Sequence, residues 1–275
     1  MSSHPLDTAL KLAPSASAAG HYTGQSSPAY WNMVGPFGGT TAATLLEAVL
    51  RHPDLLGEPL SLTVNYAGAV SAGEFEVQAQ PVRTNRSTQH WVITQLQKDA
   101  DGQPVVCTTA TAVTAARRET WSVSDAPMPQ VPPPEEVPRL DLARAVEWIN
   151  RYEMRPVAGV IPQQWDGSGD SSLSQLWMRD QPPRPLDFCA LAAMADIFFP
   201  RVWLRRATRV PAGTVSITTY FHVGLAELAA TGPGYLLGQA RAQEFRNGFF
   251  DQTAQLWNQA GQLLVSTHQV VYFKE

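Results

Sequence analysis

"GPFGGTTAATLLEAVLRHP", residues 35–53, joins two glycines to a run of strong helix formers. Glycine destabilises a helix interior by roughly 1 kcal/mol relative to alanine, so Gly38 and Gly39 are expected at the start of the helix. Two explanations fit a helix start without side chains. The glycines allow close packing against a sheet, or they let a ligand oxygen approach the free backbone N–H groups there.

The chain contains this helix and the segments after it twice. After "TTAATLLEAVLRHP" come "PLSLTVNYAGAV", "GEFEVQAQPVRTN", "TQHWVITQLQ" and "QPVVCTTATAVT". After "DFCALAAMADIFFP" come "TVSITTYFHVGL", "GYLLGQARAQEF", "GFFDQTAQLW" and "QLLVSTHQVVYF". Alternating β-branched and aromatic residues predict four strands behind each helix. The turns "KDADG" and "NQAG" each end in glycine, which is typical of a hairpin.

A proline-rich segment separates the two copies. Residues 127–138, "PMPQVPPPEEVP", contain six prolines in twelve positions, which favours an extended linker. One apolar helix followed by an antiparallel meander, present in tandem, is the pattern of a double hotdog, an α+β fold in which each sheet wraps its helix. We predict an N-terminal hotdog at 15–118, a linker at 119–144 and a C-terminal hotdog at 145–275, with the sheets joined edge to edge. The alternative is a chance likeness of two α+β domains.

Composition narrows the function. Hydrophobic residues make up 44% of the chain, charged residues make up 16%, and the net charge of −4 argues against nucleic acid as a partner. No stretch approaches the roughly 18 apolar residues of a membrane span, and the first residues do not resemble a signal peptide. Two cysteines, Cys107 and Cys189, are too few for a disulfide framework and favour a cytoplasmic protein. Scattered histidines and the absence of nucleophile, phosphate-loop or dinucleotide motifs predict no metal, no cofactor and no covalent nucleophile.

Three positions are apolar in the first copy and polar in the second. The aligned pairs are Val49 with Asp196, Pro59 with Thr214, and Ala110 with Gln269. A carboxylate at Asp196, among apolar helix neighbours, needs hydrogen-bond partners or a function. Less specific explanations are a solvent-exposed helix end, a solvent-facing strand position for Gln269 and an ordinary strand threonine at Thr214.

Together, however, these three groups suit one reaction. A carboxylate, an amide and a hydroxyl can hold one water and polarise it for attack, with the carboxylate accepting the proton. The oxyanion that forms then needs hydrogen-bond donors, which the backbone N–H groups at Gly38 and Gly39 can supply. The pseudo-twofold axis of a double hotdog would bring this helix start to residues of the other copy.

These segments resemble the acyl-CoA thioesterase II family, the TesB-like double-hotdog thioesterases. The resemblance spans essentially the whole chain and is carried by "FGGTTAATLLEAV", "AMADIFFP", "TVSITTYFH" and "LLVSTHQVV". It implies hydrolysis of an acyl-CoA to free acid and CoA in lipid metabolism, with Asp196, Thr214 and Gln269 as the family's water-activating triad. The family's helix start resembles Phe-Gly-Gly-Gln, so Thr40 here replaces an amide side chain.

The resemblance also directs attention to arginines, because the phosphates of CoA need cationic partners. Candidates are Arg83, Arg86 and the arginines of "RVWLRRATR" at 201–209, although a solvated basic surface explains most of them. Together with Gly38, Gly39 and Thr40, Arg86 completes the predicted oxyanion and substrate-binding set.

Two other functions remain open. One is a non-catalytic protein that binds acyl-CoA or an acyl chain. The other is a hotdog enoyl-CoA hydratase, whose pattern has an Asp and a His five residues apart; here Arg201 stands five residues after Asp196. The expected partner is an acyl-CoA substrate, and homo-oligomers of double-hotdog protomers are compatible with the resemblance.

Overall fold

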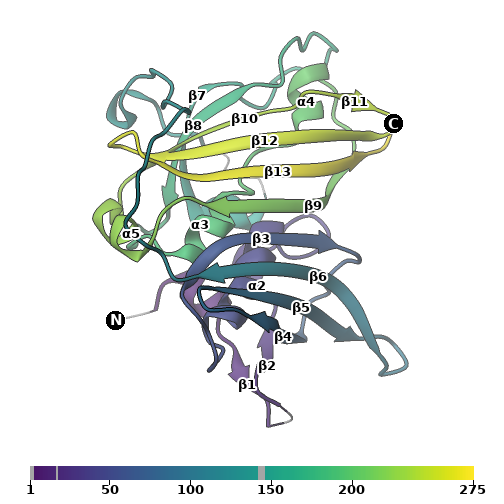
Figure 1. Ribbon diagram of the computed structural model, residues 1–275. Coiled ribbons are helices and arrows are strands. Elements are labelled where there is room, and N and C mark those ends of the chain that lie inside the picture. The colour runs from purple at the N-terminus through teal and green to yellow at the C-terminus, as the bar shows by residue number, and fades with distance from the viewer. Residues whose placement is uncertain (1–2, 17, 142–145) are drawn as a thin grey trace.

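The computed structural model describes residues 3–16, 18–141 and 146–275. All paired strands within these ranges are antiparallel, and they form one sheet with the order β1-β2-β4-β5-β6-β3-β9-β13-β12-β10-β8-β7, while β11 pairs with β12 (Figure 1). In chain order the elements are α1 (Pro5–Ala9), β1 (Ala13–Pro14), β2 (His21–Gln25), η1 (Pro28–Tyr30), α2 (Gly38–Leu50), β3 (Glu58–Tyr66), β4 (Glu74–Thr84), β5 (Thr88–Lys98), β6 (Pro104–Ala115), η2 (Pro134–Glu136), η3 (Glu147–Arg151), β7 (Tyr152–Ala158), β8 (Ser174–Asp180), α3 (Phe188–Met194), α4 (Arg201–Arg206), β9 (Ala212–Phe221), α5 (Leu225–Thr231), β10 (Leu236–Arg241), β11 (Phe245–Arg246), β12 (Phe249–Asn258) and β13 (Leu263–Phe273).

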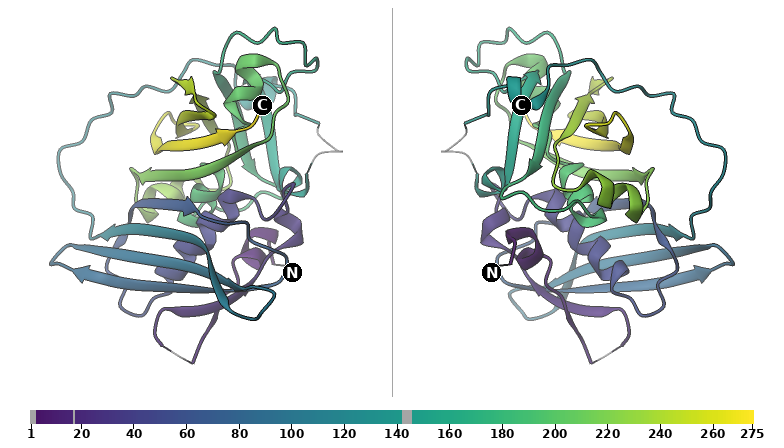
Figure 2. Two further views of the ribbon diagram at one scale, coloured as in Figure 1. Left: turned by 90° about the vertical axis from the view of Figure 1, so that its right-hand side faces the viewer. Right: turned by 90° about the vertical axis from the view of Figure 1, so that its left-hand side faces the viewer.

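Two helices, α2 and α3, lie on the inner side of this sheet, one in each half of the chain (Figures 1 and 2). Both helices are buried on nearly all sides, as expected for helices that a sheet wraps. They pack against each other in opposite directions, because Gly39 of α2 lies against Ala193 while Glu47 of α2 lies against Cys189. The predicted double hotdog is confirmed.

The two halves join along one seam between β3 and β9. The register runs from Ser61 opposite Tyr220 to Asn65 opposite Ser216. The hydroxyls of Thr63 and Thr218 lie 3.0 Å apart across the seam. The sheets are therefore joined edge to edge, as predicted.

Several elements differ from the sequence-based expectation. Strands precede each central helix: β1 and β2 in the first half, β7 and β8 in the second. The second helix is shorter than predicted, since α3 ends at Met194. Residues 225–231 form a short helix, α5, that the sequence did not predict. Asp196 therefore lies beyond the helix end, where its side chain does not have to follow the helical face. No helix in the described ranges is long and apolar enough to span a membrane.

The proline-rich segment contains one short 3-10 turn, η2, and is otherwise without helix or strand, and it packs on the outer face of the second half. The indole N–H of Trp177 donates to the Pro132 carbonyl at 2.9 Å, and that of Trp257 donates to the Ala126 carbonyl at 3.0 Å. Met128 and Val131 pack against an outer apolar cluster formed by Val137, Trp177, Tyr235 and Leu237. The domain boundaries at 15–118, 119–144 and 145–275 stay predictions, and residues 17 and 142–145 lie outside the described residues.

The glycine pair at the start of α2 is partly explained by packing. A Cβ atom on Gly39 would lie 2.4 Å from the carbonyl oxygen of Ala193 and 2.6 Å from the Phe37 ring. The backbone of α2 therefore contacts α3 directly at this residue, and Gly39 is buried.

We expect Gly39→Ala to lower the melting temperature by roughly 2–10 °C, because overpacking costs about 1–3 kcal/mol and each kcal/mol shifts a chain of this size by a few degrees. The matched control is Gly68→Ala, where an added Cβ would meet no atom closer than 3.9 Å. Thermal melts of the two variants check this, and equal melting temperatures would contradict the close contact.

Candidate active site

The carboxylate of Asp196 lies at the N-terminus of α2, although the two belong to different halves. The chain leaves α3 through Ala195 and turns, with the Asp196 N–H donating to the Ala193 carbonyl at 3.2 Å. Oδ2 of Asp196 lies 2.7 Å from where a Cβ on Gly38 would be, and the backbone of Gly39 hydrogen-bonds the carboxylate. A helix N-terminus favours an anion, and the bare glycines let this one approach.

Gln269 holds the other side of this carboxylate. Its Nε2 donates to Oδ1 of Asp196 at 2.8 Å. The residue is only 3% exposed and points inward from β13, in line with the buried Thr267 and Val271. The structure therefore brings together Asp196 and Gln269, two of the three residues predicted from the comparison of the copies.

Thr214 reaches the same face through an irregularity in the sheet. The pairing of β13 with β9 shifts between Val270 and Val271, so that Thr214 lies opposite Val271. Regular alternation would have placed Val215 there; the shift puts Thr214 on the inner face, two residues from Gln269 along the strand direction, or about 7 Å. Within the described chain, the Thr214 hydroxyl makes no hydrogen bond to Asp196 or Gln269.

Tyr66, at the end of β3, is a site residue that the sequence analysis missed. Its hydroxyl donates to the Gly38 carbonyl at 2.7 Å. Burial, and then the nearby charge of Asp196, raise its pKa well above the usual range, so the phenol stays protonated. The alignment of "LSLTVNY" with "VSITTYF" places Tyr66 over Phe221, and this added hydroxyl was the signal that could have identified it.

Burial raises the pKa of Asp196 to about 7, while the hydrogen bonds from Gln269 and Gly39 act in the opposite direction. Even so, the residue keeps some contact with solvent. A carboxyl group with a pKa near neutrality can take a proton from water and release it again at physiological pH. Its position and its pKa both suit a general base.

The other predicted binding residues do not join this cluster. Thr40 is buried on α2, and its hydroxyl has no hydrogen-bond partner among the described residues. Arg86 is exposed in the turn between β4 and β5, beside the end of β3 that begins at Glu58. Tyr66 is at the opposite end of that nine-residue strand, roughly 26 Å away. Binding of substrate by Thr40 or Arg86 stays a prediction.

The structure corrects one arginine candidate. Arg201 is completely buried, and its N–H groups donate to the carbonyls of Phe199 and Ser172 and to the Ser174 hydroxyl. Burial without a carboxylate partner lowers its pKa to about 9. The guanidinium group of Arg201 is buried and hydrogen-bonded within the protein, so it has a structural role and does not face a CoA phosphate.

Two further arginines of this segment are at the surface. Arg205 and Arg206 line an open depression that Asp170 and Glu244 also line, so its charges largely cancel. Arg206 moreover pairs with Glu275 at 2.7 Å. These arginines remain candidates for contact with CoA, without a preformed phosphate site.

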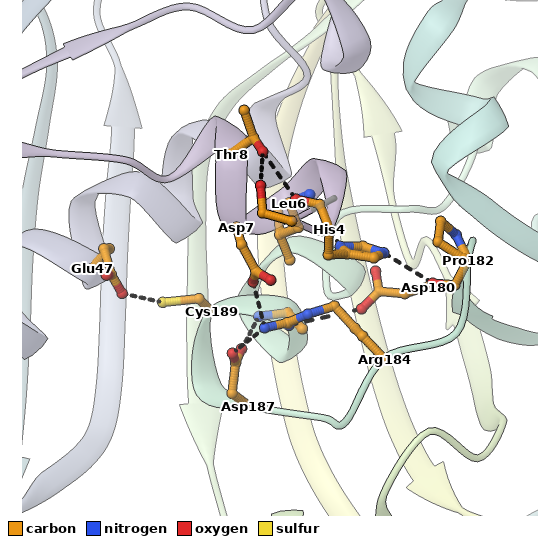
Figure 3. A network of polar contacts seen from close by, with 12 residues as sticks. His4, Leu6, Asp7, Thr8, Glu47, Asp180, Pro182, Arg184, Asp187 and Cys189 are labelled. Atoms are coloured by element: carbon orange, nitrogen blue, oxygen red, sulfur yellow. Dashed lines mark hydrogen bonds and ion pairs between the residues drawn. The ribbon is translucent and has the colours of Figure 1, made fainter. Parts of the chain in front are cut away.

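The equivalent position in the other half is built differently. Val49, which corresponds to Asp196, is fully buried and apolar. The start of α3 is covered by a network in which Arg184 donates to Asp7 of α1 at 2.8 Å and to Asp187 at 2.7 Å (Figure 3). Cys189 donates to Glu47 at 3.4 Å. Only one of the two related helix starts therefore receives a carboxylate held by a strand amide.

No group of three or more His, Cys, Asp or Glu side chains among the described residues is arranged to hold a metal ion. The cluster consists of one carboxylate, one amide, one phenol and helix-terminal N–H groups, with the Thr214 hydroxyl nearby. Such a set can deprotonate a water and stabilise an oxyanion.

Comparison with known proteins agrees with this fold. Among solved structures, the chain is similar over 100% of its length to a conserved hot dog protein of unknown function from Alicyclobacillus acidocaldarius, with 44% identity, a TM-score of 0.92 and 99% of that chain covered. A putative thioesterase II from Thermobifida fusca shares 18% identity, with a TM-score of 0.79 and coverage of 98% of this chain and 97% of the other. The acyl-CoA thioesterase II TesB2 from Mycobacterium marinum shares 20% identity, with a TM-score of 0.75 and 98% of each chain covered. No protein of curated function matches the sequence significantly.

Family models describe both halves of the chain. Residues 27–115 match the acyl-CoA thioesterase N-terminal domain, and residues 124–273 match the acyl-CoA thioesterase C-terminal domain. Together the two matches cover most of the sequence, including the glycine pair and the positions of Asp196, Thr214 and Gln269. The chain therefore belongs to the acyl-CoA thioesterase family, with the double-hotdog fold of the TesB-like enzymes.

Proposed function

We propose that this protein hydrolyses an acyl-CoA thioester with a water molecule activated by Asp196. The observation that carries the proposal is the carboxylate itself, which has a pKa of about 7 and is held between the Gln269 amide and the start of α2. Family membership supports the reaction class, and the site geometry supports the assignment of roles.

The proposed reaction proceeds by direct attack of water. Asp196 takes a proton from the water while the water oxygen forms a bond to the thioester carbon. The tetrahedral intermediate then expels the CoA thiolate. The carboxyl group of Asp196 returns the proton to that sulfur, which regenerates the base. Gln269 orients the carboxylate, and we assign the Thr214 hydroxyl to the attacking water.

The oxyanion of the intermediate needs a donor that the resting site has not already used. The backbone of Gly39 already interacts with Asp196 and lowers the pKa of its carboxyl group. The Gly38 N–H lies at the first position of α2 and has no hydrogen-bond partner among the described residues. We therefore assign the oxyanion contact to the Gly38 N–H, with Tyr66 fixing this peptide through its bond to the Gly38 carbonyl.

The alternative functions are less well supported. A hydratase of this fold would need a histidine where Arg201 is buried and bound to main-chain carbonyls. A binding protein without turnover would have no need for a carboxylate whose pKa is about 7. Hydrolysis accounts for both the charge and its partners.

We place this hydrolase in the cytoplasm and in lipid metabolism. Both cysteines are free and buried, which suits a reducing compartment. Acyl-CoA is the proposed partner, and assembly into homo-oligomers stays a prediction.

We expect Asp196→Asn to slow hydrolysis by roughly 10²–10⁴-fold, because the amide keeps the shape but accepts no proton. Acyl-CoA binding should persist. Gln269→Ala and Thr214→Val should each cost less, and combining either with Asp196→Asn should add little, since all act on one water. Release of free thiol from a panel of acyl-CoAs gives the rates.

The first copy supplies the control. A substitution at the equivalent Val49, such as Val49→Ala, should lower the melting temperature but leave the chemical step largely unchanged. Full turnover by Asp196→Asn would disprove the mechanism, and absence of hydrolysis by the wild type would favour the binding-protein alternative.

The pH dependence should report the same group. Only ionised Asp196 accepts a proton, so kcat/KM should be constant above the pKa of about 7 and fall about tenfold per pH unit below it. Asp180, whose pKa burial also raises to about 7, lies in the Arg184 network and makes no hydrogen bond to Asp196, Gln269 or Tyr66. Asp180→Asn should therefore leave the profile unchanged, and a profile that is flat from pH 5 to 8 would contradict the assignment.

Stability should respond to pH in a related way. A carboxyl group whose folded pKa is raised destabilises the fold increasingly as pH rises from its unfolded pKa near 4 to its folded pKa near 7. Asp196→Asn should consequently raise the melting temperature more at pH 8 than at pH 4. Equal effects at the two pH values, measured by thermal melts, would show that Asp196 is not strained by burial.

A further inference from the structure

Gln252 on β12 is a second amide directly beside Gln269. The two residues lie opposite each other in the pairing of β12 with β13. Gln252 is only 3% exposed, whereas its neighbours on the inner face of β12, Phe250 and Ala254, are buried and apolar. A lone polar side chain on an otherwise apolar face requires an explanation.

The duplicated fold shows that the hotdog unit itself does not require this amide. In the first half, Ile93 of β5 lies opposite Ala110 of β6, and Ala110 is the counterpart of Gln269. Ile93 is therefore the counterpart of Gln252, and the apolar pair in one half is a pair of amides in the other. The same comparison that identified Gln269 thus identifies Gln252.

The next inward-facing position on β6 and β13 gives a contrasting example. Thr108 and Thr267 are both buried, and in both the hydroxyl lacks a hydrogen-bond partner among the described residues. Because the feature is present in both halves, it belongs to the fold. Gln252 occurs only in the half that carries Asp196.

The side-chain amide of Gln252 is unpaired within the part of the chain that the structure describes. Its side chain forms no hydrogen bond to any other described residue, and its amide atoms keep a small contact with solvent. A buried amide without a hydrogen-bond partner is destabilising, because it has given up its hydrogen bonds to water. The group therefore faces something that arrives from solution, either a water or part of a ligand.

The strand order separates these two possibilities. Thr214 is on β9, Gln269 on the adjacent β13, and Gln252 on β12 beyond it. Neighbouring strands lie about 4.8 Å apart, so Gln252 is one strand further from the proposed water contact of Thr214. Its amide is better placed for the acyl group, a few bonds away from the carbon that the water attacks.

We propose that Gln252 binds the acyl group of the substrate and selects acyl groups that carry an oxygen on the third or fourth carbon over plain alkyl chains. An amide donates and accepts hydrogen bonds without charge, so it suits a hydroxyl or keto group. This inference rests on the proposed thioesterase function and assigns its substrate class.

The test compares kcat/KM for butyryl-CoA, 3-hydroxybutyryl-CoA and 4-hydroxybutyryl-CoA in the wild type and in Gln252→Leu. We expect the wild type to prefer at least one hydroxylated substrate, and Gln252→Leu to reduce that preference by about 3- to 10-fold, as for the loss of one hydrogen bond. Butyryl-CoA should be hydrolysed as well or better. Gln252→Asn, which keeps the amide, should retain part of the preference.

Ile93→Leu, at the equivalent position of the first half, is the matched control and should leave the preference unchanged. An equal loss on all three substrates, or an unchanged preference in Gln252→Leu, would overturn the assignment of Gln252 while leaving hydrolysis intact. If the wild type hydrolyses none of these or longer acyl-CoAs, the proposed function fails, and this inference fails with it. Thermal melts distinguish a folding defect from a change in specificity.

Discussion

The carboxylate of Asp196 at the N-terminus of α2 is the contact on which the site depends. It requires that the two central helices run in opposite directions, so that the end of α3 meets the start of α2. It also requires two glycines, because a Cβ on Gly38 would lie 2.7 Å from the carboxylate and one on Gly39 would lie 2.4 Å from the carbonyl of Ala193. The pairing of β3 with β9 joins the two halves and so fixes the position of α2 relative to α3. The same strand β3 also carries Tyr66, whose hydroxyl donates to the Gly38 carbonyl.

This arrangement balances two opposing effects on one group. Burial destabilises the charged carboxylate, while the Gln269 amide and the Gly39 backbone stabilise it, and the balance leaves its pKa at about 7. A fully solvated carboxylate would be a weak base near neutral pH, and one buried without partners would stay protonated. The partners therefore allow the group to be both ionised and basic.

The two halves of the chain share a fold but differ where their helices begin. Val49 and the Arg184 network occupy the region that corresponds to the Asp196 site. This network contains Asp180, whose pKa burial also raises to about 7, but no carboxylate that a strand amide holds at a helix start. The cost of a buried charge applies at every such position, whereas the proposed reaction needs only one site. Within the repeated architecture, the apolar half shows what the fold needs, and we assign the proposed chemistry to polar positions that depart from it.

Much of this was predictable from the sequence, for reasons that particular residues make clear. The doubled order of helix and strands predicted the fold, and the comparison of copies brought out Asp196 and Gln269, because a buried polar residue opposite an apolar counterpart is a local signal. The comparison also contained Tyr66 opposite Phe221, but the role of Tyr66 depends on a contact between the halves. The equivalence of Gln252 and Ile93 comes from the strand register and not from the aligned sequences.

Other features could not be anticipated from residue types. An arginine in a basic segment such as 201–209 is expected at the surface, yet Arg201 is buried and donates to main-chain carbonyls of two loops. The end of α3 before Asp196, the packing of the proline-rich segment on Trp177 and the register shift that turns Thr214 inward all follow from tertiary contacts.

The central claim is that Asp196 acts on a water molecule and does not itself attack the thioester. A single turnover in water labelled with oxygen-18, with enzyme in excess over acyl-CoA, tests this most directly. The account predicts that the acid released in the first turnover carries one oxygen-18 atom and that Asp196 remains unlabelled. Unlabelled acid together with oxygen-18 in the side chain of Asp196, detected by mass spectrometry of the peptide that contains it, would show an acyl–Asp196 anhydride and contradict the mechanism.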